Sequence, residues 1–176
     1  MPIRSKKHRY EFRTKPFAHQ FTAFDLSAEA AYFAYLMEQG TGKTWVGINV
    51  AGHLFERHKI EALIVIGPND GDIPVVWLEQ LAVHLPKRID YLAVRVRAGT
   101  MKARDKKLLK IITDPAQRVG LRVITINIES ARSGTPAFKM LLDFMRRFKC
   151  ALWIDEATRI KSPSSAQTRG VLKLGA

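Results

Sequence analysis

The stretch Ala62-Leu63-Ile64-Val65-Ile66, followed at once by Gly67-Pro68, decides the fold of this chain. Five consecutive apolar residues that stop at a glycine and a proline predict a short strand buried on both faces. Strands of this kind belong to parallel sheets that helices cover on both sides. We therefore start from an α/β sheet and work outward along the chain.

Similar apolar runs alternate with helical patterns over the 176 residues. The fold class is α/β, with a central mostly parallel sheet and helices on both faces. Ligands of such sheets bind beyond the carboxyl ends of the strands. Besides the strand at 62–66, we expect strands at 32–36, 91–96, 122–128 and 151–154, and helices at 17–31, 43–58, 74–85, 101–113, 136–148 and 164–174.

A phosphate-binding loop is expected between the strand at 32–36 and the helix at 43–58, where the chain reads Gly40-Thr41-Gly42-Lys43-Thr44. Glycines let backbone N–H groups turn toward phosphate oxygens, and the helix start adds a positive dipole. Lys43 reaches the β- and γ-phosphates, and the Thr44 hydroxyl ligates Mg²⁺. The strict motif has a glycine where this chain has Met37. A tight turn before a helix is the alternative, which explains the glycines but not Lys-Thr.

Two carboxylates follow the apolar strand at 151–154, namely Asp155 and Glu156. Behind a phosphate loop, this arrangement predicts that Asp155 holds Mg²⁺ through water. Glu156 is then expected to orient or activate the attacking water. Lys43, Asp155 and Glu156 are the expected catalytic residues. A helix cap is the alternative for the acidic pair.

The stretch Asp155-Glu156-Ala157-Thr158-Arg159-Ile160-Lys161-Ser162-Pro163-Ser164-Ser165 resembles motif II of superfamily 2 helicases. It is most similar to the Swi/Snf-type ATPases, whose D-E-A-H box is followed by x-x-K-N-x-x-S. Lys161 and Ser165 fit that tail. Thr158 replaces the histidine of the box, and Ser162 replaces the asparagine.

Weaker matches extend this resemblance over about residues 16–174. Pro16-Phe17-Ala18-His19-Gln20 resembles the Q-motif, in which Gln20 would read the adenine edge. Ile64-Val65-Ile66-Gly67-Pro68, with Trp77 and Glu79, resembles motif Ia. Val123-Ile124-Thr125-Ile126-Asn127-Ile128-Glu129-Ser130 resembles the strand and turn around motif Ib.

The resemblance implies a RecA-like P-loop NTPase domain at 16–176, preceded by a basic, flexible arm at 1–15. The implied function is ATP hydrolysis with Mg²⁺ that drives movement along double-stranded DNA. Loops at 68–69 and 129–132 would contact the DNA backbone. The family's second RecA-like domain, which supplies arginine fingers, is expected from elsewhere, in cis or in trans. We therefore expect little or no turnover from these residues alone. A phage or bacterial source, and with it a cytoplasmic and even nucleoid-associated location, is expected.

The charge of the chain points to a polyanionic partner. There are 29 Lys and Arg residues against 16 Asp and Glu, a net charge of +13. Nucleic acid is the first expectation and an anionic membrane surface a distant second, although some basic proteins are merely basic. No apolar run reaches the roughly 18 residues of a membrane span, and one cysteine excludes a disulfide scaffold. The cations gather in two stretches, 4–15 and 87–118.

Two other functions stay open beside the motor domain. A non-catalytic P-loop module that binds nucleic acid or regulates another protein would also carry a basic arm. A small P-loop kinase predicts an arginine-rich lid and an acceptor pocket, which the stretch after Asp155 fits poorly. The single cysteine, Cys150, is expected to be a core thiol.

Overall fold

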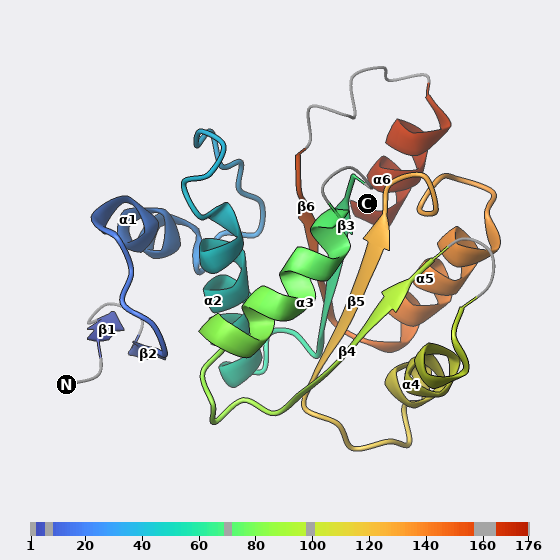
Figure 1. Cartoon of the computed structure of the whole chain (residues 1–176), viewed down its shortest axis with the longest axis horizontal. Helices are drawn as coiled ribbons and strands as arrows, with labels where there is room; N and C mark the ends of the chain where they lie inside the picture. The colour runs from blue at the N-terminus through green and yellow to red at the C-terminus, as the bar shows by residue number, and fades with distance from the viewer. Residues whose placement is uncertain (1–2, 6–8, 69–71, 98–100, 157–164, 176) are drawn as a thin grey trace.

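A computed structural model describes residues 3–5, 9–68, 72–97, 101–156 and 165–175 of the chain. Its centre is a four-stranded sheet with the order β4-β5-β3-β6, in which all neighbours are parallel. The expected α/β class with a parallel central sheet is thereby confirmed (Figure 1). The strands are β3 (Ala62–Gly67), β4 (Tyr91–Val96), β5 (Leu121–Asn127) and β6 (Cys150–Ile154).

Helices cover both faces of this sheet, because successive side chains of each strand point to opposite sides. On β3, Leu63 and Val65 join a core with α2 and α3, whereas Ile64 and Ile66 join a core with α4, α5 and α6. Figure 1 shows these two helical layers. The helices are α1 (Ala18–Ser27), α2 (Lys43–Glu56), α3 (Ile73–His84), α4 (Ala103–Thr113), α5 (Pro136–Arg147) and α6 (Ala166–Gly175).

A third core lies outside the sheet, where part of the expected flexible arm is folded. Strands β1 (Ile3–Ser5) and β2 (Tyr10–Phe12) form an antiparallel pair. Tyr10 and Phe12 point to the same side of β2 and are buried against Phe24 of α1 and Trp45 of α2. Arg13 extends this attachment by donating to the Ala82 carbonyl of α3. The arm is therefore packed from Tyr10 onward, and residues 1–2 and 6–8 lie outside the described part.

The expected strand at 32–36 is wrong. This segment is irregular between α1 and α2, with Tyr32 86% and Leu36 99% exposed. Within this segment, only Tyr35 turns inward, and the centre of its ring lies 4.9 Å from the centre of the Trp153 ring. An apolar run becomes a buried strand only where a sheet edge pairs with its backbone. Among the described residues, β6 pairs with β3 alone, so the segment has no partner there.

The remaining expected elements are present with ends shifted by a few residues. The Thr135 hydroxyl accepts from the Phe138 N–H and so caps α5, while Pro136 occupies the first turn. No helix in the described ranges combines the length and the apolar character needed to cross a bilayer. Much of the motif II resemblance, including Thr158, Lys161 and Ser162, falls outside the described residues.

Candidate functional site

Two glycines turn the backbone of the loop before α2. Gly40 and Gly42 have φ angles of 79° and 81°, in the left-handed region that favours glycine. Gly42 is the N-cap of α2, and no side chain caps this helix. The first N–H groups of α2 therefore meet no capping side chain, at the positive end of the helix dipole. Together with Lys43, this arrangement fits a phosphate group.

Lys43 is held by its own loop. Its ammonium donates to the carbonyls of Met37 and Glu38, at 3.1 and 2.9 Å. The Thr41 hydroxyl donates to the same Glu38 carbonyl at 2.6 Å. A phosphate in the loop would offer Lys43 anionic oxygens in place of neutral carbonyls, which adds the attraction of opposite charges to the hydrogen bonds.

Gln20 supports the loop from α1. It is only 5% exposed, accepts from the Phe17 N–H at 2.9 Å and donates to the Thr41 carbonyl at 3.3 Å. A Cβ atom at Gly42 would collide with the Gln20 amide, so this close approach requires glycine. Both ends of the Gln20 amide are thus bonded to the chain. The structure thus places Gln20 beside the loop, while adenine reading stays a prediction.

Asp155 lies at the carboxyl end of β6, as the sequence predicts. Its N–H donates to the Ile66 carbonyl at 2.8 Å and continues the pairing with β3. The carboxylate is largely buried at 9% exposure, and Oδ2 accepts from the Trp77 indole N–H at 2.8 Å. Oδ1 accepts from the Glu156 N–H at 3.1 Å. Two donors therefore orient this carboxylate.

Glu156 turns the chain sharply away from β6. Its φ of 52° lies in the left-handed region, which costs a residue with a Cβ about 1–2 kcal/mol. Strained backbone conformations of this kind cluster at functional sites. Glu156 is half-buried, and its backbone N–H contacts the Asp155 carboxylate.

Helix α2 is linked to Asp155 through Trp77, beside which Trp153 packs. A Cβ atom at Gly47 would lie 2.6 Å from the Trp77 ring and 2.8 Å from the Trp153 ring, so α2 packs directly on both. Trp77 in turn holds Asp155. Gly47 lies one turn after Lys43 and Thr44, and Figure 1 shows the start of α2 and the end of β6 at the same end of the sheet.

The sequence does not predict that Trp77 is a partner of Asp155. The two are 78 positions apart, and an apolar helix such as α3 predicts only that the indole is buried. The indole is completely buried. Its N–H is the only polar group it has to satisfy, and the chain satisfies it with a carboxylate.

The donor set fits magnesium better than a metal that needs a protein cage. In the described ranges, no three His, Cys, Asp or Glu side chains gather as a metal cluster. Mg²⁺ typically keeps several waters and takes one or two carboxylates together with substrate phosphates. Asp155 supplies one carboxylate of that kind, and Thr44 offers a hydroxyl in the first turn of α2.

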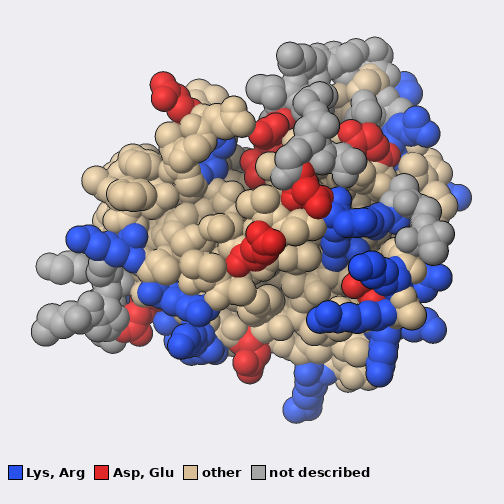
Figure 2. Space-filling view, in the orientation of Figure 1, with Lys and Arg blue, Asp and Glu red and all other residues tan. Residues whose placement is uncertain are grey.

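The loops expected to face DNA have few cations. The loop after β5 is anchored to β3 because the Ile128 N–H donates to the Gly67 carbonyl at 2.9 Å. Ser130 and Ala131 are buried, whereas Glu129 and Arg132 are exposed. Asn69 lies outside the described residues. Figure 2 shows Lys and Arg gathered instead over the part of the surface where α4 and α5 lie.

Several cations of the expected basic stretches have internal partners. Arg88 pairs with Glu56 and donates to the Glu11 carbonyl, and Arg95 pairs with Asp72 at 2.5 Å. The exposed cations of the second stretch are Lys87, Arg88, Arg97, Lys102, Arg104, Lys106, Lys107, Lys110 and Arg118.

Compared with models of known protein families and with curated proteins, the sequence matches none. Its function is therefore argued from its own residues and their geometry.

Proposed function

We propose that the chain is the first RecA-like domain of a Swi/Snf-type superfamily 2 ATPase, which binds Mg-ATP and acts on double-stranded DNA. The observation that carries this proposal is the link between α2 and Asp155, in which α2 packs on Trp77 at Gly47 and Trp77 donates to the Asp155 carboxylate. The parallel sheet with helices on both faces is compatible with a RecA-like fold.

Each residue of the site has a role in this proposal. The N–H groups that open α2, together with Lys43, bind the phosphates. Thr44 and Asp155 would hold Mg²⁺, which neutralises charge on the phosphates when bound. Glu156 orients the attacking water from its position beside Asp155. Gln20 holds the loop through the Thr41 carbonyl, and reads adenine only if it exchanges one of its present bonds.

Duplex DNA is the proposed track because the net charge is +13 and many cations are exposed. Binding through phosphates falls steeply with salt, by a factor that grows with the number of contacts. The second RecA-like domain, in cis or in trans, would supply the arginine that completes catalysis.

A non-catalytic nucleic-acid-binding or regulatory module is the second candidate, and a specific observation favours it. The Lys43 ammonium spends two of its three donors on loop carbonyls, and the segment before the loop is not paired into the sheet. A loop held by His19, by Gln20 and by its own bonds, without a paired strand before it, can bind a nucleotide without the rigid alignment that hydrolysis needs.

The test measures binding of a fluorescent ATP analogue with and without Mg²⁺, and ATP hydrolysis with and without duplex DNA. Lys43→Ala should weaken nucleotide binding at least about tenfold, the loss of a strong charged contact. Lys59→Ala, an exposed lysine just beyond α2, is the matched control and should bind like the original. Glu156→Gln should retain binding and lose any DNA-stimulated turnover.

The outcomes separate the two candidates. Magnesium-dependent binding with turnover that duplex DNA stimulates supports the motor domain. Binding without turnover, even after a second RecA-like domain is added in trans, supports the module. A folded protein that binds no nucleotide refutes both.

A further inference from the structure

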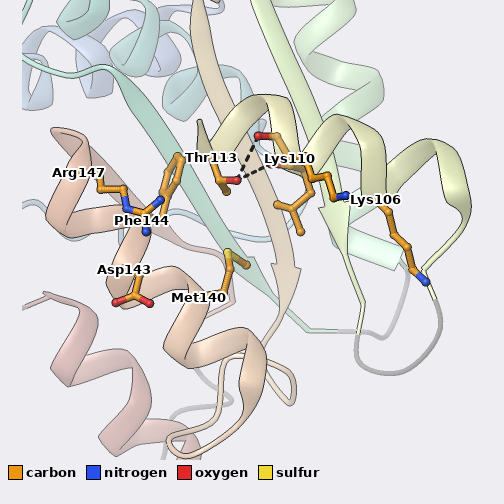
Figure 3. A pocket seen from close by; sticks show the side chains of 8 residues that line it. Lys106, Lys110, Thr113, Met140, Asp143, Phe144 and Arg147 are labelled. Atoms are coloured by element: carbon orange, nitrogen blue, oxygen red, sulfur yellow. Dashed lines mark hydrogen bonds between the residues drawn. The ribbon is translucent and has the colours of Figure 1, made fainter. Parts of the chain in front are cut away.

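An open groove separates α4 from α5, on the face of the sheet opposite α2. Its volume is about 420 Å³. Leu109 and Thr113 of α4 form one wall, and Met140 and Phe144 of α5 form the other. Figure 3 shows Met140 and Phe144 turned toward α4. The volume lies within the roughly 300–1,000 Å³ of ordinary ligand pockets, so the groove has room for a few apolar side chains.

The groove exists because both helices bury one edge of their apolar stripe and leave the other edge open. The core on this face of the sheet buries Ile112 of α4 and Leu141 and Phe144 of α5. Leu109 and Met140 pack against that core and are only partly buried. In the described part of the chain, nothing fills the space between them.

Cations border this apolar groove. Lys106, Lys110 and Arg147 line it and are exposed. One acid also lines it, Asp143, whose carboxylate is 3.1 Å from the Arg146 guanidinium. Further exposed cations surround the groove on the same two helices, at Arg104, Lys107, Lys139 and Arg146. Figure 2 shows this concentration of positive charge.

We propose that the groove between α4 and α5 binds an acidic amphipathic peptide segment of a partner protein. Its apolar side chains would enter between Leu109 and Met140, and its carboxylates would meet Lys106, Lys110 and Arg147. Methionine is flexible and polarisable, which suits a surface that adapts to a peptide. This inference concerns a surface remote from the nucleotide site and does not depend on the proposed function.

The apolar floor argues for a peptide over nucleic acid. A duplex backbone would use the cations and leave Leu109 and Met140 with no apolar partner. Single strands bind by stacking bases on exposed aromatic rings. Phe144, the one aromatic residue of the groove, is only 2% exposed and offers no such face. A peptide with both carboxylates and apolar side chains matches both features at once.

The experiment selects ligands from a displayed library of random 14-residue peptides, using the whole chain as bait. The affinity of the enriched peptides is then measured by fluorescence polarisation. Lys106→Glu/Lys110→Glu reverses two groove charges. Lys107→Glu/Lys139→Glu reverses two exposed charges on the same helices that do not line the groove, and is the matched control. Met140→Gln tests the apolar wall.

We expect enriched peptides that are acidic and amphipathic. The groove double variant should weaken them at least about tenfold, since two attractions between opposite charges become two repulsions between like charges. The control should change their affinity less than about threefold, and Met140→Gln should weaken them while the variant stays folded.

Three results would overturn the proposal. They are the absence of enriched peptides, enrichment of neutral or basic peptides, and equal effects of the two double variants. Two further probes test whether nucleic acid or a membrane binds in the groove instead. They are a 20-base-pair DNA duplex and vesicles with 30% phosphatidylserine. If the groove double variant weakens either probe more than the control does, while leaving the peptides unaffected, the groove belongs to nucleic acid or membrane instead.

Discussion

Replacing Trp77 by phenylalanine tests the link on which the candidate site depends. The indole N–H donates to Oδ2 of Asp155 at 2.8 Å, and a phenyl ring has no donor to replace it. The indole is completely buried and Asp155 is 9% exposed, so water has poor access to the carboxylate oxygen that loses its partner. The phenyl ring also leaves part of the space of the larger indole empty.

The magnitude follows from a matched control in the same cluster. Trp153 lies 5.4 Å from Trp77, ring centre to ring centre, and its buried Nε1 has no hydrogen-bond partner among the described residues. Trp153→Phe therefore removes the same ring atoms and no hydrogen bond. A hydrogen bond to a charged group contributes about 1.5–3 kcal/mol. Because Trp77 is completely buried and Trp153 only half-buried, we expect Trp77→Phe to lower the free energy of unfolding by at least that much more than Trp153→Phe does.

The assay is urea denaturation followed by far-UV circular dichroism, because both variants alter tryptophan fluorescence. Asp155→Ala and the double variant with Trp77→Phe complete a mutant cycle. Its coupling energy should be about 1.5–3 kcal/mol, since the two side chains are in direct contact. A coupling energy below about 0.5 kcal/mol, or equal losses for the two tryptophan variants, would refute the argument that Trp77 holds Asp155.

Three further predictions test packing and ionisation. Phe12→Ala should lower the free energy of unfolding by about 3–5 kcal/mol in urea denaturation, because Phe12 is only 5% exposed and belongs to the third core. A loss below about 1 kcal/mol would mean that Phe12 belongs to a flexible arm and not to a core. Leu36→Ser should change that free energy by less than about 0.5 kcal/mol, because Leu36 is 99% exposed, whereas a buried strand would lose several times more. Burial raises the pKa of the Cys150 thiol from 9.0 to about 12. The thiolate is the form that reacts with iodoacetamide, so alkylation at pH 8 should be about a thousandfold slower in the folded than in the unfolded chain, as followed by mass spectrometry. Rapid alkylation of the folded chain would contradict the burial. Because the thiol loses its proton at lower pH in the unfolded chain, Cys150 should also lower the free energy of unfolding as the pH rises from about 9 to 12.

An element can be predicted from the sequence where its burial pattern or its cap depends only on residues within or next to that element. The run at Ala62–Gly67 is apolar at nearly every position because the strand is covered on both faces, and it lies in the centre of the sheet. Thr135 and Pro136 mark the start of α5 because the cap needs only a hydroxyl and a fixed φ. Such signals depend on neighbouring residues, so they can be read from the chain alone.

The same patterns fail where burial depends on a distant partner. Tyr32 and Leu36 have the composition of a buried strand and are exposed, because an apolar run needs a sheet edge to pair with. Tyr10 and Phe12 stand in a basic stretch and are buried, because α1 and α2 present an apolar surface to them. Average charge or hydrophobicity over a window does not contain that information.

For the candidate site, the sequence by itself determined the chemical groups: the glycines and Lys43 before α2, and the carboxylates after β6. The tertiary structure alone decided that β6 lies beside β3, and that Trp77 joins Asp155 to α2. It also decided that Gln20 supports the loop with both ends of its amide. The physical reason is that residue type and periodicity are local properties. Which buried donor meets which acceptor is settled only when the whole chain packs and every buried polar group competes for a partner.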